Sequence, residues 1–162
     1  MNPLVRVIVA MLTMVAVSSA GANPNPKSLS AEKVQGYLSG KGMGFAKVAE
    51  LNGYPGPAHV LELAEPLQLT AAQKQASQKL FDTMQSKAVT LGKDLVNLEQ
   101  ELDELFTSRQ VTQQRLANLL AKIGDLNTRL RQVHIEAHLA QRLLLSEDQV
   151  VRYKQLRAHH HH

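Results

Sequence analysis

Apolar side chains recur at alternating spacings of three and four residues along two long stretches of this chain. The first series consists of Phe81, Met84, Ala88, Leu91, Leu95, Leu98, Leu102 and Leu105. The second consists of Leu116, Leu119, Ile123, Leu126, Leu130, Val133, Ala137, Ala140 and Leu144. This spacing places each series on one face of an α-helix. We therefore predict a helix over 70–107 and a second helix that begins after Thr112.

The residues between the two series, 108–111, lack this pattern and predict a short loop. Two amphipathic helices joined by a short loop pack antiparallel, because neither can bury its apolar face alone. We therefore predict an all-α fold built on a long antiparallel helical hairpin, with short flanking helices. Because two helices make a thin core, we also expect a homodimer.

Shorter elements flank the predicted hairpin. The segment 23–56 is rich in Gly, Pro and Asn, and we expect a flexible lead with one short helix near 45–51. Pro57 suits the first position of a helix over 57–65, which ends before Pro66. A last helix is expected over 146–157.

A second apolar strip lies off the main series near the open end of the hairpin. It consists of Ile135, Leu139 and Leu143. The helix over 57–65, the last helix or a partner chain could cover it.

The first 22 residues have the pattern of a secretory signal peptide. Arg6 precedes an apolar run over 7–17, and Ala20-Gly21-Ala22 offers a cleavage site. The run is shorter than the ~20 residues that span a bilayer, and no later stretch is long and apolar enough to do so. We therefore expect cleavage after export, a periplasmic location and no transmembrane span in the mature chain.

Composition narrows the classes of function. The chain has no Cys, which excludes disulfides and thiolate chemistry. Its formal charge is +4, and loss of Arg6 with the signal leaves +3, too small and scattered to predict nucleic-acid binding. There is no Gly-rich phosphate loop, Gly-x-Ser-x-Gly or His-Glu-x-x-His motif, so we do not expect an enzyme.

Two capping-box motifs stand at the starts of two of the predicted helices. Thr70 and Gln73 open the first long helix, and Ser146 and Gln149 open the last one. In such a box the hydroxyl caps the helix and the Gln side chain reaches back to the cap amide.

Together with the export signal and the absence of Cys, these boxes make the chain similar to the Spy/CpxP family, also called the LTxxQ-motif family. That family includes periplasmic refolding chaperones, zinc-resistance-associated proteins and periplasmic sensors of nickel and cobalt. The resemblance covers about residues 54–157 and implies a helical-hairpin domain over 57–157 with four helices in each protomer, often paired into a dimer.

Histidines outside the C-terminus suggest a metal site. His134 and His138 are one helical turn apart, and such a pair can chelate a divalent ion. His59, with Glu62 one turn away, could complete the site if the short helix folds toward the open end. The family's sensors also carry histidines before each box, although Leu63 here replaces a second histidine of the first helix. Zn, Ni, Co and Cu all suit these ligands. Alternatively, the histidines are surface residues hydrogen-bonded to acids such as Glu62.

The chain ends in a His-rich tail over 158–162, which is either native or the remnant of a tag and could bind such ions weakly. The leading hypothesis is a metal-binding stress protein, a sensor or buffer with a membrane-bound regulatory partner. The alternative is a metal-independent chaperone for unfolded envelope proteins. A third is an adaptor that binds another helix.

Overall fold

The structure is a computed structural model that describes residues 25–159 of the 162-residue chain. The predicted signal peptide over 1–22 and residues 160–162 of the tail lie outside the described residues. The described part contains helices and no strands, so the predicted all-α class is confirmed. It has six helices, four of which (α3 to α6) correspond to the four expected in the domain over 57–157: α1 (Ala31–Leu38), α2 (Lys47–Leu51), α3 (Pro57–Glu62), α4 (Ala71–Thr107), α5 (Gln113–Leu144) and α6 (Glu147–His159). None of the helices in this range is long and apolar enough to cross a membrane.

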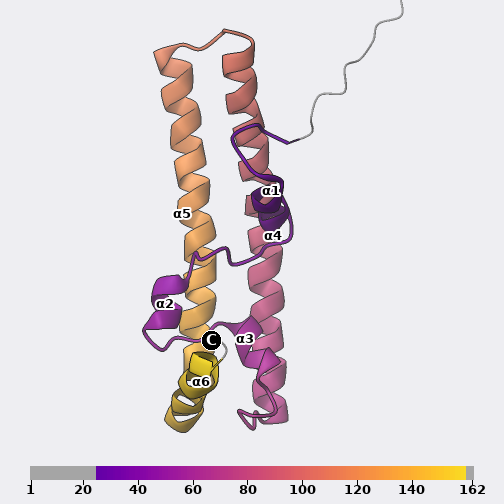
Figure 1. Cartoon of the computed structure of the whole chain (residues 1–162), viewed down its shortest axis with the longest axis vertical. Coiled ribbons are helices and arrows are strands. Elements are labelled where there is room, and N and C mark those ends of the chain that lie inside the picture. Colours follow the sequence, from indigo (N-terminus) through magenta and orange to yellow (C-terminus); the bar gives the residue numbers. More distant parts are fainter. Residues whose placement is uncertain (1–24, 160–162) are drawn as a thin grey trace, which may run out of the picture.

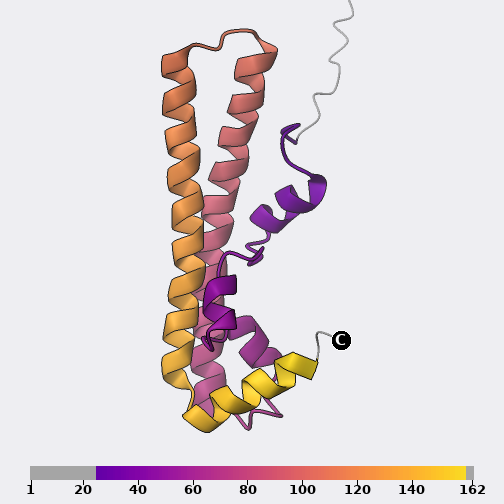
Figure 2. The same cartoon turned by 60° about the vertical axis from the view of Figure 1, so that its left-hand side comes forward.

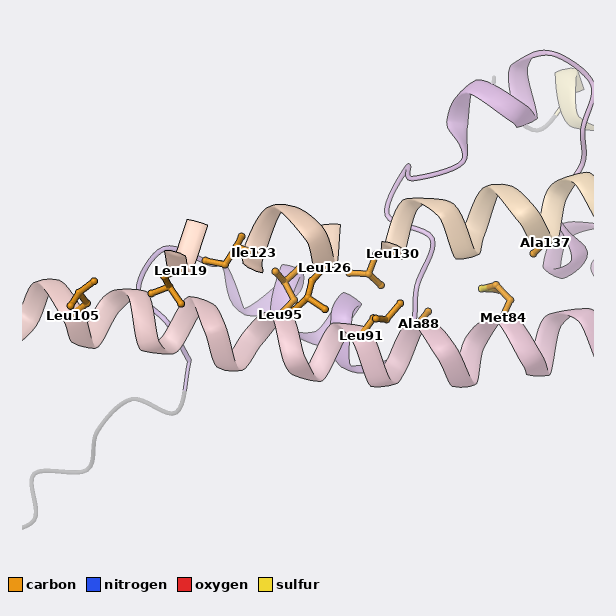
Figure 3. Packing of buried hydrophobic residues seen from close by; sticks show 10 residues of the cluster. All are labelled: Met84, Ala88, Leu91, Leu95, Leu105, Leu119, Ile123, Leu126, Leu130 and Ala137. Carbon is orange, nitrogen blue, oxygen red and sulfur yellow. The ribbon is translucent and has the colours of Figure 1, made fainter. Parts of the chain in front are cut away.

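The two long helices, α4 and α5, form the body of the molecule. They lie side by side over most of their length and run in opposite directions, with a short connection at one end (Figures 1 and 2). Buried aliphatic side chains of both helices point toward one another (Figure 3): Met84, Ala88, Leu91, Leu95, Leu105, Leu119, Ile123, Leu126, Leu130 and Ala137. All ten belong to the two apolar series of the sequence. The periodicity therefore predicted both helices and their contact face.

Both predicted capping boxes are formed. The Thr70 hydroxyl accepts from the Gln73 amide at 3.2 Å, and the Gln73 side chain accepts from the Thr70 amide at 3.0 Å. Ser146 and Gln149 repeat the pair at 3.2 and 3.0 Å.

The two capping boxes are also hydrogen-bonded to each other. The side-chain amides of Gln73 and Gln149 donate to one another's oxygens at 2.9 and 3.1 Å. Gln73 donates further to the Leu144 carbonyl at 2.8 Å, and Gln149 donates to the Leu67 carbonyl at 3.2 Å. Each amide nitrogen thus donates twice and each oxygen accepts twice, so neither group is left unpaired on burial. The start of α6 is fixed to the start of α4.

A second, smaller core lies beneath this junction. It is made of Val60, Leu67, Leu69, Leu145, Val150 and Tyr153, which come from α3, α6 and the segments that precede α4 and α6. These short elements gather at the end of the helix pair opposite the connection (Figure 2).

The segment for which we expected a flexible lead contains two helices from residue 25 on. The expected helix near 45–51 is α2, and α1 was not expected. The backbone of Tyr37 in α1 lies so close to Gly92 that a Cβ on Gly92 would stand 2.2 Å from the Tyr37 carbonyl oxygen. Gly92 therefore permits the contact between α1 and α4.

The N-terminal segment covers one flank of the helix pair, which we call the covered flank. On α4 this flank includes Gly92 and Glu99, which accepts from the Ser28 hydroxyl at 3.0 Å. On α5 it includes His134, whose ring stacks on Phe45. The predicted strip beside it stays partly open, since Leu143 is 86% exposed.

Candidate functional site

The carboxylate of Glu50 lies where four helices meet. Glu50 belongs to α2, and its Oε2 accepts from the Gly56 amide just before α3 at 3.2 Å. Its Oε1 accepts from the Tyr153 hydroxyl of α6. Tyr153 is itself buried, at 2% exposure, and the Glu50 side chain is 21% exposed. The hydroxyl thus fixes the carboxylate from the core side.

Two histidines approach the same carboxylate from different helices. The Nδ1 atom of His59 in α3 lies 3.6 Å from Glu50 Oε1, and that of His138 in α5 lies 3.6 Å from Oε2. Arg157 of α6 adds a positive charge, with its Nε 3.8 Å from Oε1. The sequence positions of these groups span more than 100 residues, and the fold brings them to one point.

The surroundings change the acidity of Glu50 and Tyr153 in opposite directions. Burial acts to raise the pKa of Glu50, but the contacts with His59 and Tyr153 and the charges of His59 and His138 outweigh it, so the pKa is lowered. The pKa of Tyr153 is raised by burial, by its hydrogen bond to Glu50 and by the charge of Glu50. Glu50 is therefore held as the anion, and Tyr153 as the neutral donor.

The orientation of His138 is fixed by the backbone. Its Nδ1 lies 2.7 Å from the carbonyl oxygen of Tyr54, so the N–H at this position donates to that oxygen, and in the neutral form of the ring Nε2 carries the lone pair. Metal-ligating histidines commonly donate their second ring N–H in this way. Space beside Nε2 depends on Gly56, where a Cβ would stand 2.7 Å from that nitrogen.

The structure does not bring His134 to this site. Its side chain is buried, at 3% exposure, and its ring stacks on Phe45 with centroids 5.6 Å apart. Burial, with a smaller contribution from the His138 charge, lowers the pKa of His134 to about 4. His134 is therefore a neutral core histidine on the covered flank, although it lies one turn from His138.

Glu62 is exposed at the end of α3. Its negative charge helps to raise the pKa of Tyr153. The acid near the histidines is Glu50, which the sequence analysis did not select. No signal within a few residues of Glu50 marked it, because it stands in the Gly-rich segment, His59 is nine residues away in another helix, and His138 and Arg157 are more than 80 residues away.

The donor chemistry of the site suits a borderline divalent ion, since two imidazoles and one carboxylate are available. As the side chains stand, however, no group of three or more His, Cys, Asp and Glu within residues 25–159 has the arrangement of a metal site. The guanidinium of Arg157 already places one positive charge beside the carboxylate of Glu50. The site is thus a hydrogen-bonded carboxylate cluster that contains the chemical groups for an ion.

Comparisons with known proteins add no relative to this picture. No protein-family model, curated protein or solved structure matches the chain.

Proposed function

We propose that this chain is an exported metal-binding stress protein with the helical-hairpin architecture of the Spy/CpxP family, acting as a sensor or buffer of a divalent ion. One observation carries the proposal: His59 and His138, 79 positions apart in the sequence, meet at the carboxylate of Glu50. These three side chains would hold the ion, and His138 would have to give up its present contact with the Tyr54 carbonyl, because the Nδ1 atom that makes it is the one that faces Glu50. In this proposed set of ligands, Glu50 takes the place of His134 and Glu62, which the sequence analysis had selected.

The residues of the site also suggest how binding would be transmitted. Glu50 connects α2 to α3 through Gly56, to α5 through His138, and to α6 through Tyr153 and Arg157. A change in the partners of Glu50 therefore changes how α6 is held against the rest of the molecule. A ligand with different affinities for the two arrangements would shift their populations.

Calorimetric titration with Zn²⁺, Ni²⁺, Co²⁺ and Cu²⁺ tests the proposal. The titration uses a variant without the signal peptide and truncated after Ala158, so that the terminal histidines cannot contribute. We expect saturable binding that the double variant His59→Ala/His138→Ala loses. The control is His134→Phe, which keeps an aromatic ring on Phe45 and should bind like the unmodified chain. Binding that survives the double variant, or that requires the tail, would contradict this site.

The second candidate is a chaperone for unfolded envelope proteins, and one observation favours it. Large apolar side chains stay exposed near the open end, with Leu143 of α5 86% and Leu51 of α2 73% exposed. Exposed apolar groups can bind unfolded chains. Suppression of client aggregation by the chain, and its loss in Leu51→Ser/Leu143→Ser, would support this function. No suppression at a stoichiometric ratio would count against it.

A further inference from the structure

Two polar side chains are completely buried between the long helices near their open end. Ser77 of α4 and Gln141 of α5 are both 0% exposed. Both continue the apolar series of their helices, since Ser77 stands seven residues before Met84 and Gln141 stands four residues after Ala137. The seam between α4 and α5 therefore carries polar groups at positions that continue the pattern of its apolar members.

The two helices meet at the level of these side chains. Gln73, one turn before Ser77, donates a hydrogen bond to the carbonyl of Leu144, three residues after Gln141. Because the helices run antiparallel, a step of one turn forward along α4 corresponds to a step of one turn back along α5. Ser77 and Gln141 therefore lie at about the same level of the seam.

Neither side chain has a hydrogen-bond partner within residues 25–159. The hydroxyl of Ser77 and both the nitrogen and the oxygen of the Gln141 amide are buried without one. These are three of the five buried side-chain atoms without a partner in this part of the chain. Buried polar groups of folded proteins are nearly always hydrogen-bonded, either to protein or to ordered water. Since the chain supplies no partner here, a donor and acceptor from outside it is required.

We propose that Ser77 and Gln141 form a buried hydration site that holds ordered water between α4 and α5. Water fits both groups, because it accepts from the amide nitrogen of Gln141 and donates to the hydroxyl of Ser77 or to the amide oxygen. Both side chains are uncharged, so the site does not call for an ion. The side chain of Ser77 is short enough, in a series that continues with Phe81 and Met84, to provide room for a molecule of this size.

The hydration site stands at the border between the two apolar clusters of the molecule. Ala137, one turn before Gln141, belongs to the cluster along α4 and α5, and Leu145, one turn after it, belongs to the second core. Figure 3 shows Ala137 together with Met84 at one end of the first cluster. A hydrated polar layer therefore separates two cores that apolar residues at these positions would join.

The same layer specifies how α4 and α5 pair. A heptad pattern alone allows one helix to slide by seven residues and still bury its apolar side chains. After such a slide Ser77 and Gln141 would no longer face each other and could not share water. A polar group at one position of a heptad seam selects the register in this way. This inference does not depend on metal binding, because it involves none of the proposed ligands.

Nuclear Overhauser effects between water and the ¹⁵N-labelled chain, without its signal peptide, test the site directly. We expect a cross-peak between water and the side-chain amide protons of Gln141, with the sign of a long-lived bound water. The control is the amide of Gln149, which donates to the Leu67 carbonyl and the Gln73 oxygen and should give no such peak. The peak should persist in Ser77→Ala, where it cannot arise from a hydroxyl that exchanges its proton with water. No peak at Gln141, or its loss in Ser77→Ala, would overturn the proposal.

Urea unfolding tests whether the two side chains share the water. Ser77→Ala removes one partner of the water and should raise the unfolding equilibrium constant about fivefold. The control, Ser86→Ala at an exposed position of α4, measures the change in helix propensity alone. Gln141→Met leaves the Ser77 hydroxyl without its partner and should raise the constant at least about tenfold.

The double variant Ser77→Ala/Gln141→Met separates a shared site from two independent groups. It leaves no polar group to satisfy, so its unfolding constant should be lower than that of Gln141→Met alone. Circular dichroism confirms that each variant is folded. If both single variants were instead more stable than the unmodified chain after the control is subtracted, the buried groups would be unpaired, and the proposal would be wrong.

Discussion

The two flanks of the long-helix pair border the same apolar seam but carry different kinds of residue. On the covered flank, α4 offers Gly92, and α5 offers His134, which is buried beneath Phe45. On the opposite flank, which we call the bare flank, exposed charged residues recur at intervals of seven: Lys87, Asp94 and Glu101 on α4, and Lys122, Arg129 and Glu136 on α5. Gly92 and the neutral His134 allow a segment of the same chain to approach closely, and the acid of the covered flank, Glu99, is hydrogen-bonded to that segment through Ser28. The identity of the residues beside the seam, and not its periodicity, therefore decides which flank is covered by the chain itself.

The largest expected difference between the flanks is in the response to acid. His134 is held neutral in the folded chain, with a pKa of about 4 against an ordinary value of 6.5. Between these values the unfolded chain binds the additional proton, so the free energy of unfolding falls as the pH is lowered from 6.5 to 4. The full loss is about 3 kcal/mol. Urea titrations across this range should show it, and His134→Phe should remove that part of the loss.

Other groups titrate in both chains, so the difference between the two pH profiles isolates His134. Glu50 also has a lowered pKa, and its stabilising contribution is lost only as the pH falls through that lowered value, which is below its ordinary 4.5. If both chains lost stability in parallel between pH 6.5 and 4, His134 would not be a buried neutral group.

The two long-helix glycines should respond to substitution with opposite signs. A Cβ on Gly92 would stand 2.2 Å from the Tyr37 carbonyl oxygen, so Gly92→Ala forces α1 away and should cost about 2 kcal/mol. Nothing lies within 4 Å of a Cβ at Gly124. Gly124→Ala should therefore stabilise α5 by about 1 kcal/mol through helix propensity.

Denaturation measures both glycine variants, and limited proteolysis of the segment before α2 checks the cause for Gly92→Ala. We expect faster cleavage there with the long helices intact. A Gly92→Ala chain as stable and resistant as the unmodified one would mean that α1 is not held on this flank.

The sequence predicted what is encoded locally and missed what depends on the N-terminal segment. The apolar series and the two capping boxes act over three or four residues, and the helices at Ala71–Thr107 and Gln113–Leu144 begin at the expected caps. The pair at His134 and His138 was assigned to one site because a turn of helix separates them. In the structure His134 is buried and stacks on Phe45, while His138 contacts Tyr54 and Glu50, and no nearby pattern places the Phe45 ring. Glu50 was missed for the same reason.

The smallest expected effect comes from two acids that are neighbours in sequence but lie on different flanks. Glu99 accepts a hydrogen bond from Ser28, so Glu99→Ala should lower the free energy of unfolding by about 0.5–1 kcal/mol. Glu101 is exposed and stands on the other flank, so Glu101→Ala should change the free energy of unfolding by less than about 0.5 kcal/mol. Urea titrations of both variants beside the unmodified chain measure the two values. Equal losses in both variants would mean that the contact between Ser28 and Glu99 does not stabilise the covered flank.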